Sequence, residues 1–355
     1  MDNMTAFRSV REEPFVIDGL YHPERPGVFR RLPEELAEKY RVMPDPINQR
    51  VAGHATAPAG GRVRFSTDAS QLTIKVTIPG RVGTSTDTQT LLSMSGFDLS
   101  AVDVDGEARY HCSLSYNGNT DLVEGGLTVN LPGDYCYDYI LYLPYLMKIS
   151  DIEIAVNEGA TLAAPKVGYK IEKPILFYGS SITHGASCSR PGLVYSAIIG
   201  RNLNANFINL GFAGAARAED EMIEYVAEKG SELSAFVLDY DHNTPSVEYL
   251  KQTHPKFYHA VREKNPDLPI FIVSAPAVTI QSDGWKARRA VILRTYVEGI
   301  EAGDRNLHLI DGFTMMQGDV PTDELLIDGT HPCDLGFHRM ALAIGGMIDR
   351  AFRDR

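Results

Sequence analysis

A serine, a histidine and an aspartate lie at positions where they can carry out nucleophilic catalysis. Ser181 follows Gly179-Ser180, and the later segment 328–332 (DGTHP) places Asp328 three residues before His331. An aspartate at that spacing can hold one ring nitrogen of the histidine, which leaves the other nitrogen free to take a proton from a serine. Alone, the first motif is also typical of an ordinary turn and the second of a structural histidine. The pattern therefore indicates acyl-transfer chemistry if the fold brings both segments together.

Two further segments can hold a negatively charged oxygen. Residues 209–214 (NLGFAG) end in Gly214, whose backbone amide can approach a ligand closely because glycine has no side chain. Residues 241–243 (DHN) end in Asn243, whose side-chain N–H can serve as another donor to an oxyanion. In isolation, a loop that needs positive φ explains the glycine, and a helix or turn cap explains the asparagine.

The elements that position these residues are expected after residue 165, where compact apolar runs alternate with helical segments. The runs are 174–178, 207–210, 235–238, 270–273 and 307–310, and the helical segments are 193–203, 219–228, 247–264, 285–300 and 335–352. This alternation predicts a parallel sheet covered on both faces, with ligands bound beyond the carboxyl ends of its strands. Ser181, Gly214 and Asn243 each follow one of the first three runs, so we expect them at one edge of the sheet.

The first half of the chain has a different rhythm, in which apolar and polar residues alternate. Residues 72–78 show the alternation most clearly, and 63–65, 127–131 and 152–156 repeat it. A period of two with turn signals between the runs predicts an antiparallel β-sandwich or jelly roll. Prolines break up residues 1–50, for which we expect an extended lead-in packed on the sandwich, with a short helix over 33–40. The predicted domains are 1–165 and 166–355.

The composition is that of a globular protein and argues against several classes of partner. The chain has 355 residues, of which 44% are hydrophobic and 23% charged, and 34 basic against 46 acidic residues give a net charge of −12. Surfaces that bind nucleic acid or anionic membranes need an excess of positive charge, so we expect neither partner. No apolar run approaches the roughly 18 residues of a membrane span.

The cysteines argue for a reducing compartment. Cys112, Cys136, Cys188 and Cys333 lie far apart, with no CxxC pair and no cysteine–histidine cluster at zinc spacing. We therefore expect reduced, mostly buried thiols, no metal site and a cytoplasmic protein. The initial residues MDNMTAFRSVREE contain no apolar segment of the kind found in secretion signals. The oligomeric state stays open, a homo-oligomer included.

Taken together, the four segments resemble the sequence blocks of the SGNH hydrolases, also called GDSL-type esterases. The blocks fall on Ser181, Gly214, Asn243 and the pair Asp328 and His331, and the resemblance covers residues 172–355. It implies a three-layer α/β/α, flavodoxin-like domain with a five-stranded parallel sheet. It also implies a Ser181–His331–Asp328 triad, an oxyanion hole made by the N–H groups of Ser181 and Gly214 and the side chain of Asn243, and no cofactor.

A finer resemblance extends to the first half. The stretches YGSSITHG, SRPG, NLGFAG and DGTHPCDLGFHRMA are similar to a bacterial subgroup whose members carry an N-terminal β-sandwich with a Gly-x-Asp-Leu-Tyr segment. Residues 96–100 match that segment, except that Ser100 replaces the tyrosine. The family pattern is broken twice at the site: Ser180 replaces the usual aspartate before the nucleophile, and Thr244 replaces the usual aspartate after Asn243.

The resemblance implies a serine esterase that works through an acyl-enzyme. Because no long apolar lid segment is present, we expect it to hydrolyse short-acyl, acetyl-like esters of a carbohydrate or glycoside. One alternative keeps this chemistry but transfers the acyl group to a small-molecule hydroxyl. An alternative of another class is a non-catalytic carbohydrate-binding protein, against which the presence of all three triad residues argues.

Four residues near these segments are candidates for the substrate pocket. Arg190 can meet a substrate carboxylate or hydroxyls, or it can pair with an acid between the domains. His242 can donate a proton or narrow the pocket, or lie in a surface loop. Cys188 and Cys333 flank the triad in sequence, and we expect them to line the pocket.

Overall fold

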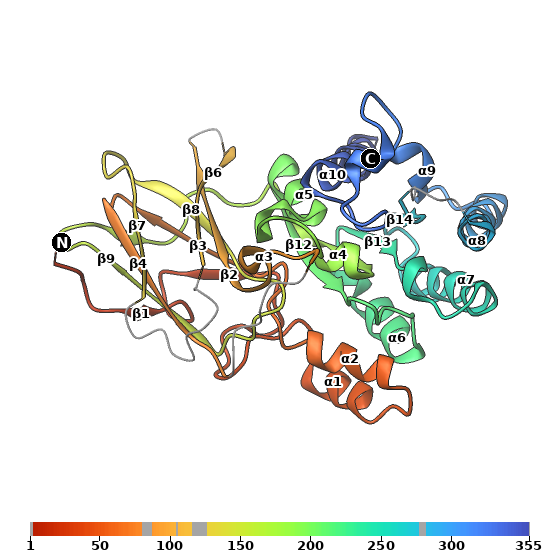
Figure 1. Cartoon of the computed structure of the whole chain (residues 1–355), viewed down its shortest axis with the longest axis horizontal. Coiled ribbons are helices and arrows are strands. Elements are labelled where there is room, and N and C mark those ends of the chain that lie inside the picture. Colours follow the sequence, from red (N-terminus) through yellow and green to blue (C-terminus); the bar gives the residue numbers. More distant parts are fainter. Residues whose placement is uncertain (1–2, 80–86, 104–105, 116–125, 277–281, 355) are drawn as a thin grey trace. The chain divides into compact units, whose positions relative to one another are not determined.

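The computed structural model describes residues 3–79, 87–103, 106–115, 126–276 and 282–354. They form two compact units, which we call the sandwich unit and the α/β unit (Figure 1). The sandwich unit comprises Met1–Pro33, Ala55–Lys170 and Ser189–Gly192, and the α/β unit comprises Glu34–His54, Ile171–Cys188 and Leu193–Arg355.

The α/β unit is built on a parallel sheet whose strands are the five apolar runs of the sequence. They are β11 (Ile171–Gly179), β12 (Ala205–Gly211), β13 (Ala235–Asp239), β14 (Ile270–Val273) and β15 (Leu307–Ile310). Their order in the sheet is β12-β11-β13-β14-β15, with every neighbouring pair parallel. The expected flavodoxin-like sheet is therefore confirmed.

Helices cover both faces of this sheet, which is why most residues of its strands are apolar. Helices α5 (Tyr195–Leu203) and α10 (Asp334–Arg353) pack together on one face, whereas α6 (Asp220–Lys229), α7 (Val247–Lys264) and α8 (Asp283–Glu301) follow one another across the other face (Figure 1). All five helices lie within two residues of the segments predicted from the sequence.

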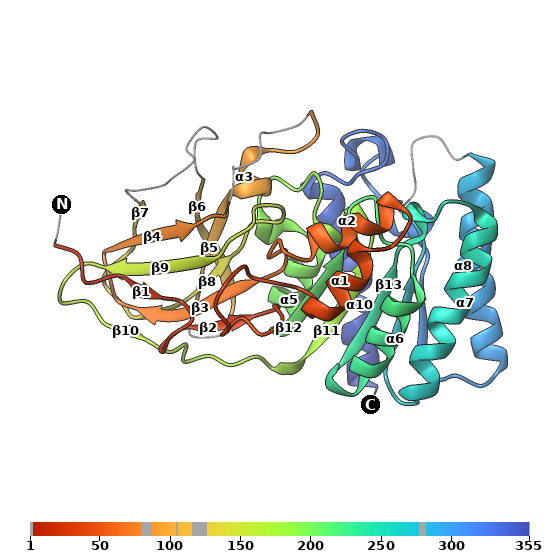
Figure 2. The ribbon, with the colours of Figure 1, turned by 90° about the horizontal axis from the view of Figure 1, so that it is seen from below.

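The sandwich unit contains two antiparallel sheets. The first has the order β1 (Arg8–Ser9), β9 (Asp151–Val156), β4 (Gln71–Thr77) and β7 (Leu127–Asn130). The second has the order β10 (Leu162–Ala163), β3 (Arg62–Thr67), β8 (Tyr137–Tyr142), β5 (Phe97–Val102) and β6 (Ala108–Leu114), with β2 (Val16–Asp18) paired to β3. Strands β4 and β9 can be followed side by side in Figure 2.

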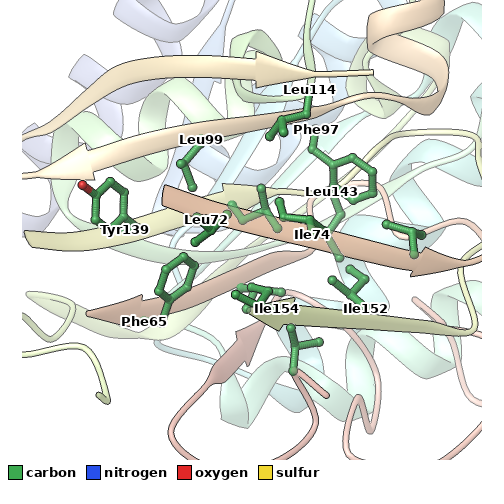
Figure 3. Packing of buried hydrophobic residues seen from close by; sticks show 14 of the residues in the cluster. Phe65, Leu72, Ile74, Phe97, Leu99, Leu114, Tyr139, Leu143, Ile152 and Ile154 are labelled. Carbon is green, nitrogen blue, oxygen red and sulfur yellow. The ribbon is translucent and has the colours of Figure 1, made fainter. Parts of the chain in front are cut away.

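Apolar side chains of the two sheets meet in the core of the sandwich unit (Figure 3). Leu72, Ile74 and Ile154 come from the first sheet, and Phe65 and Leu99 come from the second. All five side chains are fully buried. The alternation over residues 72–78 therefore reports a strand with one face on this core, as the sequence predicts.

Strand β8 shows why the sequence pattern did not predict every strand. Tyr139 and Leu141 face the core, yet Asp138 and Ile140 on the opposite side are buried as well. A strand covered on both faces lacks apolar–polar alternation, so the period-two signal is absent from it.

A helical hairpin near the start of the chain belongs to the α/β unit, which departs from the predicted 1–165 domain. Helix α1 (Glu34–Arg41) matches the short helix expected there, and α2 (Pro46–His54) was not predicted (Figure 2). Burial of Tyr40 explains the placement, since its ring is fully buried and its hydroxyl donates to Oε2 of Glu219 at 3.0 Å. Asp45 begins α2 by accepting from the N–H of Ile47 at 2.8 Å.

A second segment departs from the predicted boundary in the opposite direction. Residues Ser189–Gly192 follow the turn that carries Ser181 in sequence but belong to the sandwich unit. Oδ2 of the fully buried Asp98 on β5 accepts from Nη1 of Arg190 at 2.5 Å and from the N–H of Gly192 at 2.9 Å. A Cβ added to Gly192 would lie 2.6 Å from that oxygen, so this close approach requires glycine.

Candidate active site

The sheet brings the predicted site segments to one edge. Gly179 at the end of β11 is level with Gly211 of β12 on one side and with Asp239 of β13 on the other. The chain order reverses at β11, and such a switch point is where open α/β sheets bind ligands. The loops that carry Ser181, Gly214 and Asn243 leave the sheet from these three neighbouring strands.

Ser181 begins a short helix, α4 (Ser181–His184), directly after β11. The side chain of Ser180 accepts from the N–H of Ile182 at 3.2 Å and so caps this helix. Aspartate and serine are both good capping residues, which explains how Ser180 can stand where the family pattern has an aspartate. The chain turns away at Gly185, which has a φ of 115°.

Asp328 and His331 are held in one tight loop before α10. Oδ1 of Asp328 accepts from the N–H groups of Thr330 at 3.0 Å and of His331 at 2.7 Å. The loop is closed by the N–H of Ile327, which donates to the backbone oxygen of His331 at 2.9 Å. Gly329 takes the positive φ of 79° that this turn needs.

The three predicted triad side chains form one chain of hydrogen bonds. Oγ of Ser181 lies 2.8 Å from Nε2 of His331, and Nδ1 of His331 lies 2.7 Å from Oδ2 of Asp328. Because the carboxylate accepts a hydrogen bond from Nδ1–H, Nε2 of the neutral ring is the acceptor for the serine hydroxyl. Ser181 and His331 are 150 positions apart in the sequence, so only the fold can bring them together.

The carboxyl group of Asp328 is kept ionised by this arrangement. Partial burial by itself would raise its pKa, but hydrogen bonds from the backbone and ring of His331 and from the N–H of Thr330 outweigh it and lower the pKa. An ionised Asp328 can orient His331 and stabilise the imidazolium that forms when the ring takes a proton.

The Gly214 loop is fastened to the nucleophile helix. The N–H of Ala213 donates to Nδ1 of His184 at 3.3 Å, and that histidine is the last residue of α4. Gly214 itself has a φ of 68°.

Asn243 lies in the single helical turn Asp241–Asn243 that follows β13. Within the described residues, its side-chain oxygen is buried and has no hydrogen-bond partner. Arg288 of α8 holds this loop in place, because Nη1 donates to the backbone oxygen of Asp241 at 2.8 Å and Nη2 to that of Thr244 at 2.9 Å. Arg288 was not predicted from the sequence, since nothing local in α8 indicates a contact with a loop some 45 residues earlier.

Comparison with protein families identifies the chain. Residues 172–349 match the model of the GDSL-like Lipase/Acylhydrolase family, and residues 5–162 match GxDLY, the N-terminus of Esterase_SGNH_hydro-type proteins. The chain belongs to the GDSL-like lipase/acylhydrolase family. As a GDSL acylhydrolase, it is a carboxylic ester hydrolase with an N-terminal domain of the esterase type.

Solved structures share the fold of this GDSL acylhydrolase over nearly its whole length. A putative GDSL-like lipase from Bacteroides ovatus ATCC 8483 is 27% identical, with a TM-score of 0.83 over 99% of this chain and 98% of that chain. The salicylyl-acyltransferase SsfX3 from a tetracycline biosynthetic pathway is 19% identical, with a TM-score of 0.74 over 97% and 95%. A family two carbohydrate esterase from Clostridium thermocellum, in complex with cellohexaose, is 16% identical, with a TM-score of 0.62 over 95% and 99%. No curated protein matches.

Asp239 of the acylhydrolase is hydrogen-bonded to the turn that carries Ser181. Its Oδ2 accepts from the hydroxyls of Tyr195 at 3.0 Å and Thr183 at 3.2 Å, while its backbone oxygen accepts from the N–H of Ser180 at 3.2 Å. Burial, with a smaller contribution from the carboxylate of Asp241, raises the pKa of Asp239 to about 7. This buried network was also missed, because its members are far apart in the sequence.

His242 sits beside Asn243, and its Nε2 is buried without a hydrogen-bond partner among the described residues. Burial lowers the pKa of its ring, and the nearby charges of His331 and Arg288 act in the same direction against the carboxylate of Asp241. His242 is therefore not a freely solvated histidine in a surface loop, which was the alternative considered from the sequence. Its role as a pocket residue stays a prediction.

The other pocket candidates have partners of their own. Arg190 pairs with Asp98 and lies over the ring of Tyr110 at 4.0 Å, so the structure favours the ion-pair alternative. Cys188 is buried and its Sγ donates to the backbone oxygen of Gly185 at 3.0 Å, while Sγ of Cys333 lies 3.4 Å from that of Glu324. The placement of both thiols in the pocket stays a prediction.

The described residues offer no metal cluster and no membrane-spanning helix. They contain no group of three or more histidine, cysteine or acidic side chains that could hold a metal ion. No helix of the described part is both long and apolar enough to cross a membrane. All four cysteines are free thiols, although only Cys188 is buried, whereas the sequence led us to expect most of them to be.

Proposed function

We propose that this acylhydrolase is a serine esterase in which Ser181 is the nucleophile, His331 the general base and Asp328 the residue that orients the base. The observation that carries the proposal is the continuous hydrogen-bond chain through these three side chains at the carboxyl edge of the sheet. Such a chain can transfer the serine proton to the histidine as the serine oxygen attacks.

The reaction proceeds in two steps. Oγ of Ser181 bonds to the ester carbonyl carbon while its proton passes to Nε2 of His331, and the N–H groups of Ser181 and Gly214 with the Asn243 amide hold the resulting oxyanion. The C–O bond to the alcohol then breaks, and His331 gives the proton to the departing alcohol. Water attacks the acyl-enzyme with His331 again as base, which releases the acid and restores the serine.

We propose short acyl groups, acetyl-like, on a carbohydrate or glycoside as the substrate. Two observations support this choice: the sequence has no long apolar lid segment, and the fold is shared over nearly the whole chain with a family two carbohydrate esterase.

A panel of 4-nitrophenyl esters from acetate to octanoate, followed by peracetylated sugars, tests the substrate class. We expect kcat/KM to be highest for the shortest acyl chains and acetate to be released from the sugars. Cleavage restricted to long chains would contradict the short-acyl assignment while leaving the triad in place.

Acyl transfer to a small-molecule hydroxyl is a second candidate, favoured by the fold shared with the salicylyl-acyltransferase SsfX3. Water and an added alcohol compete for the same acyl-enzyme, so the ratio of acid to new ester separates the two functions. Transfer is supported if new ester dominates at millimolar acceptor. A non-catalytic binding role is contradicted if purified protein turns over any ester and Ser181→Ala does not.

We also propose a cytoplasmic location, because four free thiols fit a reducing compartment. The substrate is then a small-molecule or carbohydrate ester.

A further inference from the structure

Helix α2 is hydrogen-bonded to the loop that carries Gly214. His54 at its end lies with Nε2 3.1 Å from the backbone oxygen of Ala213, and Asp45 just before its start accepts from Nη1 of Arg217 at 2.6 Å. The ring of His54 also packs edge-on against His184 of α4, with 5.0 Å between the ring centroids. A helix from the first 60 residues is therefore fixed on both sides of the proposed oxyanion donor.

Arg50 lies between these two anchors on α2 and reaches Gly214. A Cβ added to Gly214 would lie 3.4 Å from Nη1 of Arg50 and would meet no other described atom within 4 Å. The open side of Gly214 thus faces one guanidinium group. The N–H of the same glycine is a proposed donor to the oxyanion, so the guanidinium lies beside a residue of the proposed oxyanion hole.

The side chain of Arg50 has no acidic partner among the described residues. Among the described residues it has no ion pair and no hydrogen bond, and its side chain is exposed. Two acids of the same hairpin are already engaged, since Asp45 pairs with Arg217 and Glu38 with Arg41. A guanidinium offers several donors in a flat fork that matches a carboxylate.

We propose that Arg50 binds a carboxylate of the substrate, so that the enzyme prefers esters with an anionic group close to the scissile carbonyl. The proposal rests on the proposed function, because it takes Gly214 as part of the oxyanion hole. With a net charge of −12, the field of the whole protein repels such substrates, which makes a local cation decisive for their selection. The carboxylate belongs either to the acyl group or to the alcohol.

Two matched pairs of esters test this and distinguish the two positions. Monoethyl succinate against ethyl levulinate places the charge on the acyl side, and 4-acetoxybenzoate against 4-acetoxybenzamide places it on the alcohol side. For one pair, we expect Arg50→Gln to lower the charged-to-neutral ratio of kcat/KM about 10- to 100-fold, mainly through KM, as for a lost charge-assisted hydrogen bond. Arg50→Lys should restore part of the ratio, and added salt should weaken the preference.

The control variant is Arg294→Gln on α8, which removes the same charge from an exposed arginine that pairs with Glu298. It should leave both ratios at the wild-type value. If Arg50→Gln and Arg294→Gln change the ratios equally, or if neither pair responds to Arg50→Gln, the proposal is overturned.

Binding to the Ser181→Ala protein separates this proposal from the proposed function. Dissociation constants of the same four esters are measured by ligand-observed NMR, with and without the added Arg50→Gln substitution. A charge-dependent loss of binding in a protein whose wild type cleaves none of the esters would support the role of Arg50 and contradict the hydrolase assignment. Equal affinity for charged and neutral esters, unaffected by the substitution, would overturn the role of Arg50 even if hydrolysis is confirmed.

Discussion

Two regions of the molecule bring together polar side chains from distant parts of the sequence. The regions differ in how far these side chains are exposed to solvent. At the carboxyl edge of the α/β sheet, the side chains of Asp328 and His331 are 29% and 26% exposed. In the sandwich unit, Asp98 is fully buried and Arg190 is closed against it, with 17% of its side chain exposed. The first region keeps donors and acceptors accessible, whereas the second uses its charges to hold a loop. Substitutions in the first should cost activity, and those in the second should cost stability.

The largest expected effect is in the first region. Ser181→Ala should lower kcat by about four to six orders of magnitude, because the members of a triad act as a unit. Its thermal unfolding should match that of the wild type, since His331 is the only hydrogen-bond partner of the half-buried hydroxyl among the described residues. Hydrolysis of 4-nitrophenyl acetate and a melting curve check both halves. Full activity in the variant would remove Ser181 from the mechanism.

In the second region, Asp98→Asn should reduce the free energy of unfolding by about 3–5 kcal/mol, because it leaves the guanidinium of Arg190 without its buried counter-ion. Urea unfolding of the sandwich unit, followed at its own transition, measures the loss. Asp134→Asn, on an exposed position of the same unit, is the matched control. A destabilisation no larger than that of the control would show that the ion pair does not hold the 189–192 segment.

Asn243→Ala tests the oxyanion hole and should lower kcat about 10²- to 10³-fold with little change in stability. Asn243→Asp keeps the shape of the side chain but replaces its donor with a negative charge, so it should lose at least as much activity. Steady-state kinetics on one short ester suffice for both. Near-wild-type kcat in the aspartate variant would exclude Asn243 as an oxyanion donor.

Asp239 shares a feature with each region. It is buried like Asp98, but it is hydrogen-bonded to the turn that carries Ser181. Its pKa is about 7 in the folded protein, whereas the ordinary value is 3.8. Between about pH 4 and pH 7, the carboxyl group is therefore protonated in the folded protein and ionised in the unfolded chain. Its contribution to stability is therefore complete below about pH 4 and is lost as pH rises to about 7. Between pH 4 and pH 7, the free energy of unfolding of Asp239→Asn should therefore rise by about 2–4 kcal/mol relative to that of the wild type.

Urea unfolding at a series of pH values measures this difference. Asp323→Asn, an exposed acid of the same unit, is the control and should follow the wild-type curve. A constant difference between Asp239→Asn and the wild type from pH 4 to pH 7 would contradict the protonated state of Asp239.

Ser180→Ala should have the smallest effect, a loss of about 1 kcal/mol of stability from the missing helix cap. The neighbouring nucleophile stays in place, so the variant should still react with a serine-directed probe. A melting curve and a labelling assay make the comparison with Ser181→Ala direct, because the two serines are adjacent. Loss of labelling without loss of stability would mean that Ser180 takes part in the chemistry.

Much of the fold could be predicted from periodicity, and the proposed triad was predicted from the positions of its residues relative to the strands. The five parallel strands are continuous apolar runs, and Ser181 and Asn243 come directly after two of them. Contacts between distant segments leave no such pattern. Arg190 is near the nucleophile in sequence but belongs to the sandwich unit, while Arg50 is 131 positions before Ser181 and belongs to the α/β unit.

Covalent labelling tests the central claim most directly. Wild-type protein is treated with a fluorophosphonate, and the modified residue is located by peptide mass spectrometry. We predict one adduct per chain, on Ser181, formed far more slowly in His331→Ala and absent from Ser181→Ala. An adduct on another residue, or an unlabelled Ser181 in protein that hydrolyses esters, would contradict the account.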